Sequence, residues 1–401
     1  MKKHLYIFLM ISISCSVPKD TEEKNRSSNL TMSTEKMAMK VVGQLKLQAN
    51  PTMRFGTNSI STFLHNGEEI ISYLDSDSQK IITFDSDSGE LLDQITLEIE
   101  GPNGVGNIGY VSAHYHHSPD SIFLFNRQTS PLYLINGKGE IIKKYTVTDY
   151  SGSTNFPVPN SSTMSPIHIW NNFLLLSCGI QNYEEDFTGY PSLLKLDLKN
   201  GKIDYLTTLP EIYSKAFWGA YFKYDPSIAL NLGKNKVIIS YPVDHQVYEI
   251  DLINGVEEKH IIKSDFIQEI IPYQDDPAFF TSRNPNERDE KENVHAFSTS
   301  EYRGLIYDHW RNIFYRIAIL RPSRDKVLAG DKKFSFSIIT FNENFEKVGE
   351  SPFTTNTHDP SSIFLTRKGL AIFRKDLYLQ NEDLFVFDLF NPISIGEDSE
   401  K

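Results

Sequence analysis

The chain has 401 residues, of which 23% are charged and 12% are aromatic, with 26 Phe and 20 Tyr against 3 Trp. These proportions are typical of a strand-rich globular protein and exclude a chain that is disordered throughout. The formal net charge of −12 excludes the concentrated positive field that binding to nucleic acid requires.

The first residues are typical of an export signal. Two lysines precede an apolar run over residues 5–13, which is too short to cross a membrane as a stable anchor. Cys15 follows this run in an arrangement that resembles a bacterial lipobox, although Ser12 stands where the lipobox usually has Leu. We therefore predict a lipoprotein signal peptide over residues 1–14 and lipidation of Cys15. The alternative is an ordinary secretory signal that is cleaved nearby.

Both alternatives export the protein, and lipidation would place it in the cell envelope, periplasmic or associated with the outer membrane. Residues 15–39 are rich in Lys, Glu, Ser, Thr and Asn without strand alternation, so we expect a flexible tether.

Cys178 lies in the apolar segment FLLLSCGI, where an unpaired Cys is expected to be a small core residue.

A short pattern recurs six times along the chain, with four positions biased towards apolar residues closed by Asp or Asn. The copies are IITFD, LYLIN, LLKLD, VYEID, IITFN and LFVFD, and they end at Asp85, Asn136, Asp197, Asp251, Asn342 and Asp388. Such a run is typical of a buried strand that stops at a turn, because Asp and Asn side chains bond nearby backbone N–H groups. A further strand-like run follows each of the first five turns, so the pattern predicts repeated β-hairpins.

The intervals between the copies are close to one four-stranded blade, which predicts an all-β, six-bladed β-propeller with antiparallel blades. The first four blades are expected over residues 60–97, 108–147, 166–209 and 228–263, and the fifth begins with GLIYD at residue 304. Residues 265–300 and 321–332 are extra to this plan, and the charged run 283–293 is expected to form a solvated insertion.

The sixth blade lacks an outer strand of its own. Residues 40–48, KVVGQLKLQ, alternate like a strand and have no partner nearby. Because an open sheet edge promotes aggregation, we predict that this segment completes the sixth blade and closes the ring. The prediction is one propeller domain over residues 40–395, followed by a polar tail at 396–401.

The order of these features resembles the six-bladed propeller lipoproteins of the Bacteroidetes, in families known only as domains of unknown function. The similarity depends on Cys15, on the six hairpins and on GLIYDHWRNIFYRI at residues 304–317, which looks like the fifth blade of that group. It covers nearly all of the mature chain. The resemblance implies the fold and the location but no catalytic residues, and it extends broadly to NHL-type propellers, most of which bind partners.

Two groups of residues are candidates for a ligand site in the central channel, where the innermost strands converge. The first is SAHYHHS, in which strand alternation puts His114 and His116 on one face and His117 on the other. Two histidines without a carboxylate or Cys fall short of a zinc site, so we expect a polar channel lining and no metal.

The second candidate group is aromatic and basic, and it could bind a sugar ring or a carboxylated ligand. Its members are Trp218, Tyr221, Tyr302, Arg303, Tyr307, Asp308, His309 and Arg316. The alternative is packing between blades, with Asp308 and Arg316 as a structural ion pair. A third feature, the acidic string from Asp75 to Gly89, faintly resembles a calcium loop but is expected to be turn chemistry.

The sequence contains no nucleophile elbow and no helix that follows a Gly-rich phosphate loop. We therefore predict a binding module of the cell envelope rather than an enzyme, with no cofactor. Its ligand would be a small molecule, a glycan or a protein. The alternatives are a propeller hydrolase or lyase acting on a carbohydrate or related small molecule, and a structural subunit of an envelope complex.

Overall fold

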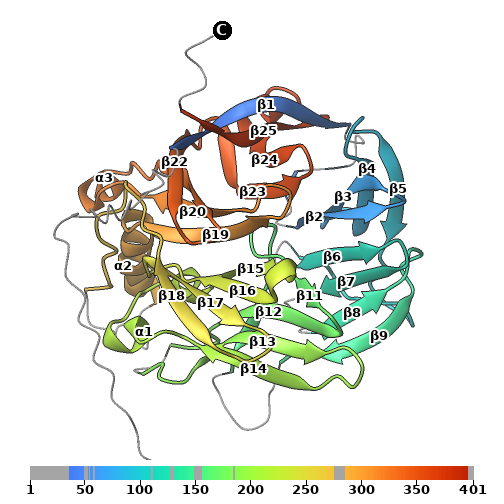
Figure 1. Ribbon diagram of the computed structural model, residues 1–401, viewed down its shortest axis with the longest axis horizontal. Coiled ribbons are helices and arrows are strands. Elements are labelled where there is room, and N and C mark those ends of the chain that lie inside the picture. The colour runs from blue at the N-terminus through green and yellow to red at the C-terminus, as the bar shows by residue number, and fades with distance from the viewer. Residues whose placement is uncertain are drawn as a thin grey trace, which may run out of the picture. The chain divides into compact units, whose positions relative to one another are not determined.

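The structure, a computed structural model, describes residues 36–48, 53, 55–56, 59–109, 112–126, 131–148, 156–183, 186–274 and 285–395, with backbone only at 285–289. The predicted signal peptide, Cys15, most of the predicted tether and the tail at 396–401 lie outside the described residues. The described chain forms six antiparallel sheets arranged in a ring, which confirms the predicted six-bladed propeller (Figure 1).

The first three blades follow one another around the ring. Blade 1 contains β2 (Ile60–His65), β3 (Glu68–Asp75), β4 (Lys80–Asp85) and β5 (Leu91–Thr96). Blade 2 contains β6 (Ala113–Ser118), β7 (Ser121–Phe125), β8 (Pro131–Ile135) and β9 (Ile141–Thr146). Blade 3 contains β10 (Val158–Asn160), β11 (His168–Trp170), β12 (Phe173–Gly179), β13 (Pro191–Asp197) and β14 (Ile203–Thr208).

The other three blades complete the circle. Blade 4 contains β15 (Ser227–Asn231), β16 (Lys236–Ser240), β17 (Gln246–Asp251) and β18 (Glu257–Ile261). Blade 5 contains β19 (Glu301–Asp308), β20 (Ile313–Leu320), β21 (Ser335–Asn342) and β22 (Lys347–Thr354). Blade 6 contains β23 (His358–Thr366), β24 (Gly369–Arg374), β25 (Leu384–Ser394) and, at its outer edge, β1 (Met37–Gln48).

The repeated Asp or Asn ends a buried strand by the expected turn chemistry. The carboxylate of Asp85 accepts backbone N–H bonds from Asp87 at 3.0 Å and from Ser88, and these bonds lower the pKa of Asp85. Gly89 closes the turn with φ of 74° by donating its N–H to the carbonyl of Asp85. The acidic string at residues 75–89 therefore includes a hairpin turn, as predicted.

Strand β1 closes the ring by pairing antiparallel with β25, from Met37 opposite Ser394 to Gln48 opposite Leu384. This confirms the predicted pairing, and the strand begins three residues before the predicted segment. Leu45 and Leu47 are buried in a core shared by blades 6 and 1. At Gly89 a Cβ would collide with the backbone of β1, so the closing strand passes directly against blade 1.

All innermost strands begin at the same face of the ring, because each blade has four antiparallel strand positions, the innermost of which is shared by β10 and β11 in blade 3. Extra segments gather at this face, which we call the capped face: α1 (Ile212–Lys215), η1 (Tyr221–Tyr224), α2 (Pro285–Ser298), α3 (Arg324–Leu328) and α4 (Lys375–Tyr378). The charged run predicted as a solvated insertion is mostly the helix α2, which contacts α3 (Figure 1). A further 3-10 turn, η2 (Leu232–Lys234), lies at the opposite face between β15 and β16.

Blade 3 departs from the regular pattern at the channel. Its innermost strand is divided, since β10 and β11 both pair with β12. The prediction started this blade at residue 166 and so missed β10. Between the two pieces, residues 161–167 leave the sheet, and we call them the plug segment.

Candidate functional site

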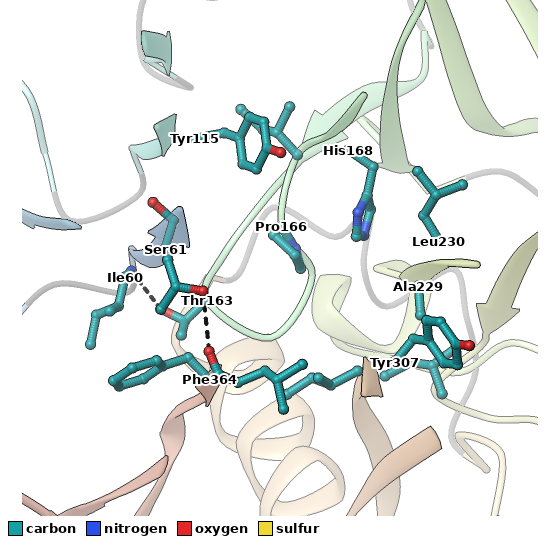
Figure 2. Close-up of a pocket in the computed structure, with 15 residues that line it drawn as sticks. Ile60, Ser61, Tyr115, Thr163, Pro166, His168, Ala229, Leu230, Tyr307 and Phe364 are labelled. Carbon is teal, nitrogen blue, oxygen red and sulfur yellow. Dashed lines mark hydrogen bonds between the residues drawn. The ribbon is translucent and has the colours of Figure 1, made fainter. Parts of the chain in front are cut away.

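The central channel holds a pocket of about 160 Å³ that all six blades line. Its walls are Ile60, Ser61, Thr62, Tyr115, Thr163, Pro166, Ile167, His168, Ala229, Leu230, Leu305, Ile306, Tyr307, Phe364 and Leu365. Figure 2 shows Pro166 of the plug segment in the middle of this group, between Ser61 on one side and Leu230 on the other. The plug segment therefore forms part of the wall of this channel pocket.

Hydrogen bonds hold the plug segment to three other blades. The Thr163 hydroxyl accepts the N–H of Ile60 at 3.0 Å (Figure 2), and the Ser165 hydroxyl accepts the N–H of Ile228 at 3.3 Å. The carbonyl of Met164 accepts the N–H of Leu305 at 3.4 Å. The plug segment is therefore fixed to blades 1, 4 and 5.

Gly304 allows the plug segment to approach blade 5. A Cβ at this position would lie 3.1 Å from both Cβ and Sδ of Met164, and 2.8 Å from Cδ1 of Ile317. A side chain at residue 304 would displace Met164 or the strand itself. Close packing against Met164 therefore explains the Gly at the start of GLIYD. The sequence pattern alone did not reveal this contact.

The polar groups of the channel pocket are uncharged, and most of them are already bonded. The Thr62 hydroxyl donates to the carbonyl of Leu365 at 3.2 Å, and the Tyr307 hydroxyl donates to the Glu343 carboxylate at 2.6 Å. His168 Nε2 lies 3.1 Å from the carbonyl of Ile228, and burial lowers the pKa of His168 to about 4, so its ring is neutral at pH 7. The pocket therefore suits an uncharged, largely apolar group.

The size of the channel pocket limits what can enter it. An engineered cavity of about 150 Å³ lined by apolar side chains holds benzene. The channel pocket, at about 160 Å³, accepts a group of similar size. A single aromatic ring or a branched alkyl group fits, whereas an oligosaccharide would have to remain outside.

His114 and His116 share one face of β6, as predicted, but that face packs against blade 1. Both rings bond the Ser72 hydroxyl, at 2.8 Å from His114 Nε2 and 3.0 Å from His116 Nδ1. Burial lowers the pKa of His114 to about 3 and that of His116 to about 4, so both rings are neutral. Tyr115, which lies between them in sequence, is the residue of this strand that lines the channel pocket.

The predicted aromatic and basic cluster is spread over several places. Tyr307 lines the channel pocket, and His309 is exposed at the hairpin that follows β19, with its ring against Trp310. Trp218 is buried, and its indole N–H donates to the carbonyl of Ile212 at 3.1 Å. Tyr221, by contrast, is 44% exposed at the capped face.

Tyr302 and Arg316 join blade 5 to blade 4. Arg316 is fully buried, with its guanidinium 3.5 Å from the centre of the Tyr302 ring. The guanidinium donates to the Ser240 hydroxyl and to the carbonyls of Tyr241, Asp244, His245, Gln246 and Ile262. These two residues therefore pack blade 5 against blade 4.

The expected ion pair between Asp308 and Arg316 is wrong. The Asp308 carboxylate instead bonds the guanidinium of Arg311 at 2.9 Å and the hydroxyl of Tyr315 at 3.2 Å. Arg316 lies opposite Leu305 in the sheet, so strand register places it away from Asp308, whose partner is Ile313.

Arg303 belongs to a buried ionic cluster at the capped face that sequence reasoning did not identify. Glu301, fully buried, lies 2.7 Å from Arg321 Nη2, 3.0 Å from Lys223 Nζ and 3.3 Å from Arg303 Nε. Burial acts to raise the pKa of Glu301, but the three cations lower it to about 2. The clearest signal for this cluster was a Glu at the start of the innermost strand β19 with an Arg two residues later, on the same face of the strand.

The described residues contain no group of three or more His, Cys, Asp or Glu side chains arranged to hold a metal ion. They also contain no helix that is both long and apolar enough to cross a membrane. Cys178 is buried in blade 3, and burial raises the pKa of its thiol, which makes it a core residue rather than a nucleophile.

Comparisons with known proteins agree with this architecture. The family model described as "Domain of unknown function (DUF4221)" matches residues 25–352. A solved structure of a DUF4221 member from Bacteroides vulgatus is similar, with a TM-score of 0.75 and 19% identity over 90% of this chain and 99% of that chain. No curated protein matches the sequence.

Two further solved structures are more distant. One is a Bacteroides fragilis protein named as exported, with a TM-score of 0.52 and 12% identity over 87% of this chain and 94% of that chain. The other is an inactive variant of virginiamycin B lyase from Staphylococcus aureus, with a TM-score of 0.43 and 13% identity over 87% of this chain and 99% of that chain. Only the first of these two similarities supports the fold.

Proposed function

The chain belongs to the DUF4221 family of β-propellers, and from that premise we propose that it is an exported, lipid-anchored binding module that catalyses no reaction. Its ligand would place an uncharged apolar group, about the size of one aromatic ring, in the channel pocket. The observation that carries this proposal is the pocket itself, which has room for such a group and uncharged polar groups at its walls. The two histidines that were candidates for chemistry face blade 1 instead.

Filling the channel pocket should abolish binding. Leu230 lines the pocket, whereas Leu232, two residues later, is 59% exposed. We expect phenol and benzene, used as probes, to give saturation-transfer difference NMR signals with the wild type and with Leu232→Trp. With Leu230→Trp the signals should fall about tenfold or more, because the added indole occupies a cavity of that size.

Two results would contradict this proposal. One is equal probe binding by Leu230→Trp and Leu232→Trp, provided that circular dichroism shows both to be folded. The other is turnover of any member of a glycan and lactone panel by the purified protein, which would favour the hydrolase or lyase alternative.

The lipid anchor rests on the sequence, since Cys15 lies outside the described residues. We expect Cys15→Ala to move the protein from the membrane fraction to the soluble periplasmic fraction, because one thiol carries the whole anchor. Fractionation of cells and labelling with a fatty-acid analogue measure this change. Cys178→Ala is the matched control and should stay membrane-bound. A Cys15→Ala protein that remains labelled and membrane-bound would exclude the anchor.

A further inference from the structure

A second, smaller pocket of about 50 Å³ lies at the capped face. It is lined by Met164, Arg303, Ile319, Arg321, Phe334, Pro360 and Ser361. The plug segment contributes Met164 here, whereas it contributes Thr163, Pro166 and Ile167 to the channel pocket. The two pockets therefore share no lining residue, and we call this one the basic pocket.

The basic pocket has an excess of positive charge. Lys223, Arg303 and Arg321 surround the single carboxylate of Glu301, and Asp225 is the second carboxylate that acts on Arg303. Among the described residues, three cations therefore face two carboxylates, which leaves an excess of one positive charge. Burial lowers the pKa of Lys223 to about 8 and also lowers that of Arg303. Keeping these two groups charged therefore costs free energy of desolvation.

The guanidinium of Arg303 is not fully bonded. Within the described part of the chain, Arg303 Nε is buried and makes no hydrogen bond, although it lies 3.3 Å from the Glu301 carboxylate as an ion pair. The guanidinium of Arg303 lies 4.0 Å from the centre of the Phe222 ring, and that of Arg321 lies 4.7 Å from the centre of the Phe334 ring. These contacts fix both planes before any ligand arrives, which favours binding.

The shape of the basic pocket selects the kind of anion. Planar guanidinium groups match the two oxygens of a carboxylate, and the limited volume favours a planar carboxylate over a tetrahedral phosphate. Ile319, Phe334 and Pro360 offer apolar walls for a short carbon chain. The Arg303 side chain is 34% exposed and Ser361 is exposed, so solvent reaches the site.

We infer that the basic pocket binds the carboxylate group of a small organic acid, with Arg303 and Arg321 as its cationic ligands. This site is separate from the channel pocket and does not depend on the function proposed for it. A bound carboxylate would neutralise the surplus charge and accept hydrogen bonds from the guanidinium groups of Arg303 and Arg321.

The test is thermal melting of the full folded chain with sodium acetate, sodium phosphate or sodium chloride at equal ionic strength. A ligand that binds only the native state raises the melting temperature. We expect acetate to raise it and phosphate to match chloride. In Arg303→Gln the acetate affinity should fall about 10- to 100-fold, the usual loss for a hydrogen bond to a charged group.

Three further variants make the result decisive. Arg324→Gln removes one exposed positive charge from the same face without lining the pocket, and it should keep the acetate response. Ser361→Trp should lose the response by filling the pocket while leaving all cations in place. Leu230→Trp should keep the response, which separates this site from the channel pocket. An acetate response that survives in Arg303→Gln, that is absent from the wild type, or that phosphate matches would overturn the inference.

Discussion

Deletion of residues 40–48 is expected to leave a protein that is unfolded or melts far below the wild type. The deletion removes most of β1, and with it the antiparallel ladder to β25 and the buried side chains of Leu45 and Leu47. Each buried Leu contributes about 2–5 kcal/mol to the free energy of unfolding, which totals only about 5–15 kcal/mol in a typical domain. Circular dichroism melting of the purified protein measures the effect.

Single substitutions in the same strand make this prediction sharper. Leu47 is fully buried between blades 6 and 1, whereas Val41 is 55% exposed. We expect Leu47→Ala to lower the free energy of unfolding by about 2–5 kcal/mol and Val41→Ala to change it by about 0.5 kcal/mol or less. A deletion variant that melts like the wild type would show that β1 does not close the ring.

Replacement of Arg316 by Leu should be the most damaging single substitution in the joint between blades 4 and 5. The guanidinium satisfies one hydroxyl and five backbone carbonyls of blade 4 and its outgoing chain, all from a fully buried position. Each buried acceptor left without a donor costs about 1–3 kcal/mol. We therefore expect a loss of about 4 kcal/mol or more in the free energy of unfolding, measured by urea denaturation.

Two comparison variants test the cause of this loss. Arg316→Lys keeps the charge but has three donors on one nitrogen instead of a planar fork, so an intermediate loss is expected. Arg324→Leu replaces an exposed Arg on α3 and should change stability by about 0.5 kcal/mol or less. If Arg316→Leu were as stable as Arg324→Leu, the carbonyl contacts would not hold the two blades together.

The fold was predictable because its signals are local. Each copy of the repeated pattern carries its own strand and its own turn, as the Asp85 carboxylate and Gly89 show. The closing strand was predictable for a different reason, since residues 40–48 alternate and the sixth blade was one strand short. Both inferences used only neighbours in sequence and a count of strands.

The candidate site was only partly predictable, because it depends on contacts between distant segments. The three-residue strand β10 is too short to give a periodic signal, so the plug segment after it was missed. Strand alternation correctly placed His114 and His116 on one face but could not say whether that face met the channel or blade 1. The partner of Asp308 was predicted wrongly, because register and not proximity in sequence decides which charges meet.

The closing strand also imposes an order on how the protein is made. β1 is the first strand of the fold to be synthesised, and its partner β25 is the last, so the Gln44 side chain bonds Asp388 across 344 positions of chain. Until β25 emerges, β1 has no partner, and only β23 and β24 of the sixth blade can pair, which leaves an open sheet edge. Such long-range closure slows folding and exposes intermediates to aggregation. Nascent chains of this protein should therefore depend on holding chaperones until their last residues emerge.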